Sequence, residues 1–227
     1  MKLNDKLMEF ERLINFLNRL KKNNNRDWFN NHKKEFVELK EQFEVFINQL
    51  IPKIKQLDGF NGSLSAKDCI FRIYRDVRFS KNKAPYKTHF GAYLADGGRK
   101  SSFAGYYVHI EPEGSFAGGG VYHPEPVVLK ELRYEIMDKT DEFKGIISES
   151  GFKNIYPEIY GDKLKIAPKG FPIDFEDIEL LKFKSYALVH AIDDKTIKSS
   201  GFEDYLLNLY KTAKPFNSFF NKVIAEI

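Results

Sequence analysis

The chain of 227 residues lacks several features that mark common protein classes. Its single cysteine, Cys69, excludes an intrachain disulfide and a zinc site built on cysteines, and this fits a reducing cytoplasm. The first residues, Met1–Lys6, are polar and lack the apolar stretch of a secretory signal. Nowhere do ~18 apolar residues follow one another, so we expect no membrane span. Cys69 precedes Ile70 and Phe71, which favours a small buried side chain over a nucleophile.

The net charge of +4 is too small to mark the whole surface as a binder of nucleic acid or membrane. That charge is unevenly distributed. Between Lys67 and Lys100 there are nine basic and three acidic residues, a local charge of +6, so the remaining chain carries −2. Neither GxGxxG nor GxxxxGK[ST] occurs, so dinucleotide and P-loop sites lack their motifs and the cofactor stays unknown.

Apolar and aromatic residues are plentiful. The hydrophobic fraction is 42%, and 21 phenylalanines and 12 tyrosines predict a core of rigid rings. We find no internal repeat, no low-complexity tract and no linker long enough to divide the chain. The sequence therefore predicts one domain over residues 1–227.

The first part of the chain has the hydrophobic periodicity of helices. Apolar residues recur at helical spacing at Leu7, Phe10, Leu13, Ile14, Leu17 and Leu20. Asn23, Asn24 and Asn25 then predict a stop and an N-cap. A second helix is predicted from a stripe made of Trp28, Phe29, Phe36, Leu39, Phe43, Phe46, Ile47, Leu50, Ile54 and Leu57. We expect Pro52 to kink or break it.

The middle of the chain predicts strands at residues 88–95, 103–111 and 115–122, with a tight turn at 112–114. Tyr107, His109 and Glu111 should point to the opposite face from their neighbours. Helical spacing returns after Pro124, a further strand is expected at 186–192, and a helix closes the chain. The predicted fold class is α+β, with a central antiparallel sheet packed by N- and C-terminal helices.

The segment from Arg72 to His89 concentrates side chains that can carry chemistry. We expect a short strand to about Tyr74 and then an ordered loop that turns at residues 82–85. Its basic side chains match the paired oxygens of phosphate or carboxylate, and the expected ligand-binding residues are Arg72, Arg75, Arg78 and Lys83. Asp76 would orient a guanidinium or act as a general base. Alternatively, a buried arginine–aspartate network braces the loop, or the charges form a solvated face.

One motif in this segment resembles the signature of a sparsely distributed bacterial family of about this length, conserved hypothetical proteins with a domain of unknown function. The motif reads Arg72-x-x-Arg75-Asp76-x-Arg78-Phe79-x-x-Asn82-Lys83-x-x-Tyr86. The stretches 105–112, 116–120 and 124–126 also resemble that family. The resemblance implies membership over nearly the whole chain and brings no reaction with it.

Three glycines and five histidines complete the set of candidates. Gly118, Gly119 and Gly120 end a predicted strand, where backbone N–H groups could face an anionic ligand; a bulge, or tight packing against an aromatic ring, is the alternative. His109 and Glu111 with the distant His190 formally match an iron-binding triad. Such triads usually lie in barrels of eight strands, and this chain offers four or five, so we predict no metal site. Any of His89, His109 and His123 could line a cleft, and His32 completes the five.

Three functional hypotheses follow. The first is an enzyme or binder of a small anionic ligand, with Asp76, Tyr86 and His109 as acid–base candidates. The second is a nucleic-acid-binding module, in which basic residues follow phosphates while Tyr86, Tyr93 and Phe103 stack on bases. The third is a non-catalytic protein whose arginine motif braces the fold. The sequence predicts no membrane partner and leaves the oligomeric state open.

Overall fold

The computed structural model describes residues 8–60 and 62–227, which cluster into two compact units. The first unit contains the described residues up to Arg99 together with Tyr107–Ala117 and Ala191–Leu207. The second contains Lys100–Tyr106, Gly118–His190 and Asn208–Ile227. The chain passes between the units several times, and the single domain that we expected stays a prediction.

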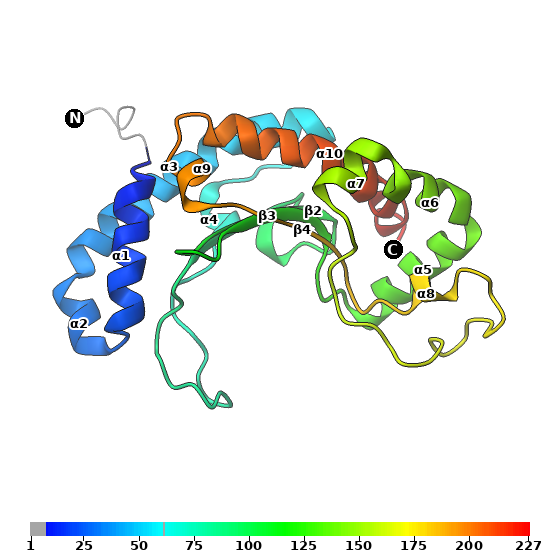
Figure 1. Cartoon of the computed structure of the whole chain (residues 1–227), viewed down its shortest axis with the longest axis horizontal. Helices are drawn as coiled ribbons and strands as arrows, with labels where there is room; N and C mark the ends of the chain where they lie inside the picture. The colour runs from blue at the N-terminus through cyan, green and yellow to red at the C-terminus, as the bar shows by residue number, and fades with distance from the viewer. Residues whose placement is uncertain (1–7, 61) are drawn as a thin grey trace. The chain divides into compact units, whose positions relative to one another are not determined.

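Helices α1 (Phe10–Lys22), α2 (Arg26–Asn31) and α3 (Lys33–Asp58) open the first unit, and α1 lies beside α3 (Figure 1). The predicted stop at the asparagines is confirmed: Asn23 ends α1, and the Asn25 side chain caps α2 by accepting a hydrogen bond from the Trp28 N–H. Leu7, which we placed on the first helix, lies outside the described residues.

The single second helix that we predicted is wrong, because it is divided at His32 into α2 and α3. The His32 ring stacks on Trp28 with the ring centroids 4.0 Å apart. The apolar stripe continues across this one-residue division, so periodicity cannot detect it. We expected a kink or a break at Pro52; the break is wrong, since α3 runs through Pro52 to Asp58, and the kink stays a prediction.

A four-stranded antiparallel sheet of order β1-β2-β3-β4 is packed against α3 and α10 (Phe202–Ile224), which confirms the α+β prediction. The strands are β1 (Phe90–Leu94), β2 (Gly105–Ile110), β3 (Phe116–Val121) and β4 (Tyr186–Ala191), each within a predicted segment. On β2, the side chains of Tyr106, Val108 and Ile110 are fully buried. The turn predicted after β2 is present, and Glu113 takes a positive φ of 61° there.

Aromatic rings fill the core of each unit, as the composition predicted. In the first unit, the Phe46 and Phe202 rings stack, and Phe10 meets both edge-on. Three short helices lie before, within and after the run of strands: α4 (Ala66–Cys69) precedes β1, η2 (Gly98–Lys100) joins β1 to β2, and α9 (Asp194–Ile197) follows β4. Cys69 is fully buried, as expected.

In the second unit, helices α5 (Pro126–Asp138), α6 (Thr140–Ser148), α7 (Ser150–Ile155) and α8 (Ile178–Leu181) follow β3. The Phe143 ring contacts the rings of Phe216, Phe219 and Phe220 on α10. The helices expected after Pro124 and at the end of the chain are therefore confirmed. Among the residues described, none of the helices combines the length and apolarity that crossing a membrane requires.

Candidate functional site

One face of β2, opposite the side chains of Tyr106, Val108 and Ile110, carries a chain of hydrogen-bonded polar side chains. The Tyr107 hydroxyl lies 3.1 Å from His109 Nδ1, and His109 Nε2 lies 3.2 Å from Glu111 Oε2. Strand alternation places these three residues on one face, as the sequence predicted. His109 is 7% exposed, whereas Tyr107 and Glu111 are half-buried.

A second histidine joins them from the neighbouring strand. His89 immediately precedes β1, and its ring centroid lies 4.1 Å from that of His109. One ring nitrogen from each histidine and one carboxylate oxygen of Glu111 lie within 4.8 Å of one another. We call His89, His109 and Glu111 the His–Glu cluster; its three donor atoms are of the kind that can hold a metal ion.

Neighbouring residues fix the orientation of the cluster. The Thr88 hydroxyl donates a 2.5 Å hydrogen bond to Glu111 Oε1. Phe116 of β3 stacks on the His109 ring, with centroids 4.5 Å apart and an interplanar angle of 15°. A Cβ atom at Gly91 would lie 2.5 Å from the Tyr107 hydroxyl oxygen, so a glycine leaves that hydroxyl the space to reach His109.

Burial keeps both histidines of the cluster neutral near pH 7. Burial, together with the smaller effect of the neighbouring His109, lowers the pKa of His89 to about 4. Burial also lowers the pKa of His109, against the opposing effect of the hydrogen bond with Glu111. Burial alone would raise the pKa of Glu111, but hydrogen bonds with Thr88 and His109 outweigh it and lower that pKa. The contact between His109 and Glu111 is therefore a hydrogen bond rather than an ion pair.

One cation, Lys87, lies next to the cluster, and the exposed Arg72 acts on Lys87. Lys87 is half-buried, and its pKa is lowered by burial and by the positive charge of Arg72. The charge of Lys87 also lowers the pKa values of His89 and His109. Within residues 8–60 and 62–227, neither Lys87 nor Arg72 forms an ion pair with a carboxylate. Lys87 therefore places a positive charge beside the cluster that no carboxylate pairs directly, while the Glu111 carboxylate within the cluster opposes its effect on the two histidines.

Most of the basic residues that we expected to bind a ligand are bonded within their own loop. The segment from Arg72 to Thr88 projects beyond β1 (Figure 1), with bridges between Ile70 and Ala92 and between Tyr74 and Tyr86 in place of the predicted short strand. Arg75 donates to the Ala84 carbonyl and Lys83 donates to the Val77 carbonyl. The predicted turn at residues 82–85 is present.

Asp76 and Arg78 form an ion pair of 2.6 Å, with side chains 47% and 77% exposed. Arg78 lowers the pKa of Asp76 through that contact. The pair is solvated, so the buried arginine–aspartate network offered as an alternative is not what these two residues form. The roles of Asp76 as base or orienting group stay predictions.

Tyr86, a second acid–base candidate, is 5% exposed and stacks on Phe29 with ring centroids 3.9 Å apart. Burial raises its pKa. The Asn24 side chain bonds both backbone groups of Tyr86, accepting from its N–H and donating to its carbonyl. Tyr86 therefore attaches the base of the loop to the first helices, and its catalytic role stays a prediction.

The close approach expected at the glycine run is made by strand β4. A Cβ atom at Gly118 would lie 1.7 Å from the Leu188 carbonyl oxygen, and one at Gly120 would lie 2.1 Å from the Tyr186 carbonyl oxygen. Gly120 also has a φ of 98°, and Gly119 lies against the Asn217 side chain. Tight packing therefore accounts for Gly118, Gly119 and Gly120, and their predicted contact with an anion stays a prediction.

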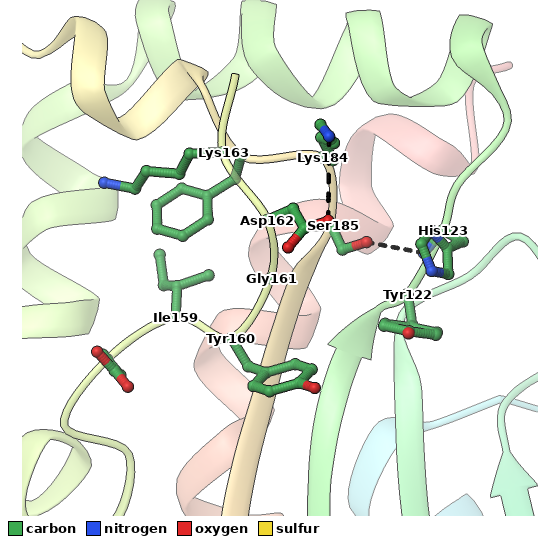
Figure 2. A pocket seen from close by; sticks show the side chains of 11 residues that line it. Tyr122, His123, Ile159, Tyr160, Gly161, Asp162, Lys163, Lys184 and Ser185 are labelled. Carbon is green, nitrogen blue, oxygen red and sulfur yellow. Dashed lines mark hydrogen bonds and ion pairs between the residues drawn. The ribbon is translucent and has the colours of Figure 1, made fainter. Parts of the chain in front are cut away.

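The second unit contains a separate pocket of about 500 Å³ (Figure 2). Tyr122 and His123 line one side of it, and the His123 N–H donates to the Ser185 hydroxyl. Asp162, Lys163 and Lys184 give its wall both signs of charge. His190, the second histidine of the formal triad, also belongs to the second unit, where its Nδ1 contacts the Ile155 carbonyl. The structure thus groups His89, not His190, with His109 and Glu111.

Sequence reasoning named His89 as a possible cleft residue and placed Tyr107 on one face with His109 and Glu111, but it did not group His89 with them and it missed the parts played by Thr88 and Lys87. Each lies on or beside a predicted strand, but the sequence does not give the register between β1 and β2. One signal was available: a His-x-Glu pair on one strand, with a histidine at the start of the strand before it.

Comparison with known proteins gives one match. The model of a family described as conserved hypothetical protein (DUF2461) matches residues 12–219, which is most of the chain. No curated protein and no solved structure matches the chain.

Proposed function

We propose that this chain, which belongs to the DUF2461 family of conserved hypothetical proteins, binds a small anionic ligand beside Lys87 and Arg72. The ligand carries phosphate or carboxylate, because those groups match the donors of lysine and arginine. As an enzyme, the protein would use His109 for proton transfer, since that ring is neutral near pH 7 and hydrogen-bonded at both nitrogens.

The observation that carries this proposal is the half-buried ammonium of Lys87, which lies 5.4 Å from the Phe71 ring centroid and forms no ion pair with a carboxylate among the described residues. An ammonium group loses hydration on burial, and the charge of Arg72 opposes it further. A bound anion would relieve both effects at once. The other basic residues of the predicted site give weaker support, because Arg75, Arg78 and Lys83 already bond within their loop.

The test is a thermal melt in the presence of phosphate, pyrophosphate, sugar phosphates, nucleotides and citrate. A ligand present at about 100 times its Kd should stabilise the folded protein by about 2.7 kcal/mol. Lys87→Gln should abolish the increase in melting temperature. Lys81→Gln is the matched control, since Lys81 lies in the same segment and is exposed. No increase with any compound, or equal losses in the two variants, would refute the proposal.

A second candidate function, nucleic-acid binding, is favoured by Phe79. Its side chain is 96% exposed on the basic loop, and the Arg78 guanidinium lies 5.9 Å from its ring centroid. An exposed ring among cations can stack on the bases of a single strand. Of the rings that we first considered, Tyr86 is buried, so Phe79 replaces it in this role.

Fluorescence anisotropy with a labelled single-stranded oligonucleotide tests this candidate. We expect Phe79→Ala to weaken binding and added salt to weaken it further. Tyr122→Ala, which removes another exposed ring (61%), serves as the control. Equal affinities for wild-type and Phe79→Ala protein would rule out stacking on Phe79.

A further inference from the structure

We propose that the His–Glu cluster binds one divalent transition-metal ion, with His89, His109 and Glu111 as its protein ligands. The inference rests on donor geometry and surroundings, and it does not depend on the anionic ligand proposed above. A metal bound to His109 Nε2 would take the place of the proton-transfer role proposed for that ring. It also replaces our expectation of no metal site, which rested on a triad that included His190.

The separations between the donor atoms suit a common metal. With bonds of about 2.0–2.1 Å, neighbouring ligand atoms lie about 3.3 Å apart around a tetrahedral ion and about 2.9 Å apart around an octahedral one. His109 Nε2 and Glu111 Oε2 lie 3.2 Å apart. The ligand atoms of the cluster all lie within 4.8 Å of one another, so the proposal requires only a small movement, which we assign to rotation of the half-buried His89 ring.

Tyr107 supplies the hydrogen bond that a metal-binding histidine requires. A ligating imidazole donates its other N–H to a neighbouring group, which fixes the tautomer. The Tyr107 hydroxyl, 3.1 Å from His109 Nδ1, can accept that proton and leave the Nε2 lone pair for the metal. Without metal, the same hydroxyl can donate to Nδ1 while Nε2–H donates to Glu111. The hydrogen-bond network is therefore satisfied in both states.

A hydrogen bond also fixes the orientation of the Glu111 carboxylate. Thr88 donates to Oε1, which leaves Oε2 directed at His109 and available to the ion. Phe116 stacks on the ring of His109 and restricts its rotation. A set of three ligands with oriented neighbours is the arrangement of metal sites that retain open positions for water or substrate.

The donor set indicates the class of metal. Two imidazole nitrogens and one carboxylate oxygen suit Zn²⁺, Fe²⁺, Mn²⁺ or Co²⁺ better than Ca²⁺ or Mg²⁺, which prefer oxygen ligands. Two neutral histidines and one carboxylate leave a divalent ion with a net charge of +1. With Lys87 close by, the open positions favour water or an anionic group as further ligands.

Metal binding can be measured directly on the full chain after chelator treatment and dialysis. Calorimetric titration with Zn²⁺, Mn²⁺ and Co²⁺, and anaerobically with Fe²⁺, should give one equivalent per chain for at least one ion. Bound Co²⁺ should show the visible absorption of a site with nitrogen ligands. No stoichiometric binding of any of the four ions would overturn the proposal.

Matched variants assign the ligands. His89→Gln and Glu111→Gln should each weaken binding by at least about tenfold. His190→Gln and Glu113→Gln are their controls: His190 belongs to the formal triad of the sequence, and Glu113 is an exposed acid two residues beyond Glu111. Both controls should bind as wild-type does. Unchanged binding in His89→Gln and Glu111→Gln, or equal losses in the controls, would overturn the assignment.

Tyr107→Phe tests the hydrogen bond to His109 while the three ligands stay in place. We expect metal affinity to fall by about 10- to 100-fold, with the melting temperature of the metal-free protein close to that of wild-type. His109→Gln is left out of the main series because its buried site could prevent folding. Zinc binding that survives in Lys87→Gln, with phosphate binding lost, would separate this site from the anion site. Unchanged affinity in Tyr107→Phe would refute the role of Tyr107.

Discussion

Replacing Gly118 by alanine should destabilise the protein severely, because strand β4 occupies the space that the new methyl group needs. The added Cβ would lie 1.7 Å from the Leu188 carbonyl oxygen, while real contacts of this kind do not fall below 3.0 Å. The backbones of β3 and β4 would have to move apart by about 1.3 Å, the difference between those two distances. Backbone hydrogen bonds of about 2.9 Å do not survive such a displacement.

The size of the expected destabilisation follows from the hydrogen bonds and packing that Gly118→Ala would disrupt. Two sheet hydrogen bonds contribute roughly 1 kcal/mol each, and forced overpacking costs about 1–3 kcal/mol more. We therefore expect Gly118→Ala to lower the free energy of unfolding by at least about 3 kcal/mol. Urea denaturation followed by far-ultraviolet circular dichroism measures this value, with m compared between the variants.

Gly145→Ala is the matched control in the same unit. Gly145 is exposed within α6, and a Cβ there meets nothing within 4 Å. Alanine should raise the free energy of unfolding by about 0.5–1 kcal/mol, because glycine is a poor helix former. The same chemical change thus has opposite effects at two positions. A Gly118→Ala protein within 1 kcal/mol of wild-type, by the same assay, would refute the packing argument.

Three further outcomes test other parts of the structure. Burial raises the pKa of the Cys69 thiol to about 12, so the thiol stays protonated well above neutral pH; a thiol reagent should label it slowly in the native protein and rapidly in denaturant. Asp76→Ala should leave the melting temperature nearly unchanged, because the ion pair with Arg78 is solvated, whereas a large loss would indicate burial. The N–H groups of Gly151 and Phe152 lower the pKa of Glu149, so its stabilising effect is complete above the ordinary value of 4.5 and disappears as the pH falls through the lower folded value. Urea midpoints of wild-type and Glu149→Gln protein should therefore differ near neutral pH and converge in acid, and a constant difference would contradict this.

The sequence predicted the strands well because each one carries its own signal. Alternation along 105–110 separated Tyr107 and His109 from the buried Tyr106 and Val108, and this alternation is local information. The division at His32 could not be predicted in the same way. The apolar residues of α2 and α3 continue one stripe, while the stacking of His32 on Trp28 is a detail of side-chain geometry.

The candidate site was only half predictable. His109 and Glu111 share a strand, so their spacing places them on one face. His89 reaches them through the pairing of β1 with β2, and register is set by contacts across the sheet rather than by spacing along the chain. The glycine run is also only partly predictable. Three adjacent glycines indicate that some group lies close to their backbone, but only the structure shows that this group is the Leu188 backbone.

The two hydrogen bonds between Asn24 and Tyr86 join residues 62 positions apart. The Asn24 amide thereby bonds both the N–H and the carbonyl of Tyr86, as the backbone of a neighbouring strand would. The base of the basic loop should consequently exchange its amide hydrogens slowly, at Arg75 and Lys87 as well, where backbone bonds close the loop. Asn24→Ala should therefore speed amide hydrogen exchange at Tyr86, 62 positions along the chain from the substituted residue.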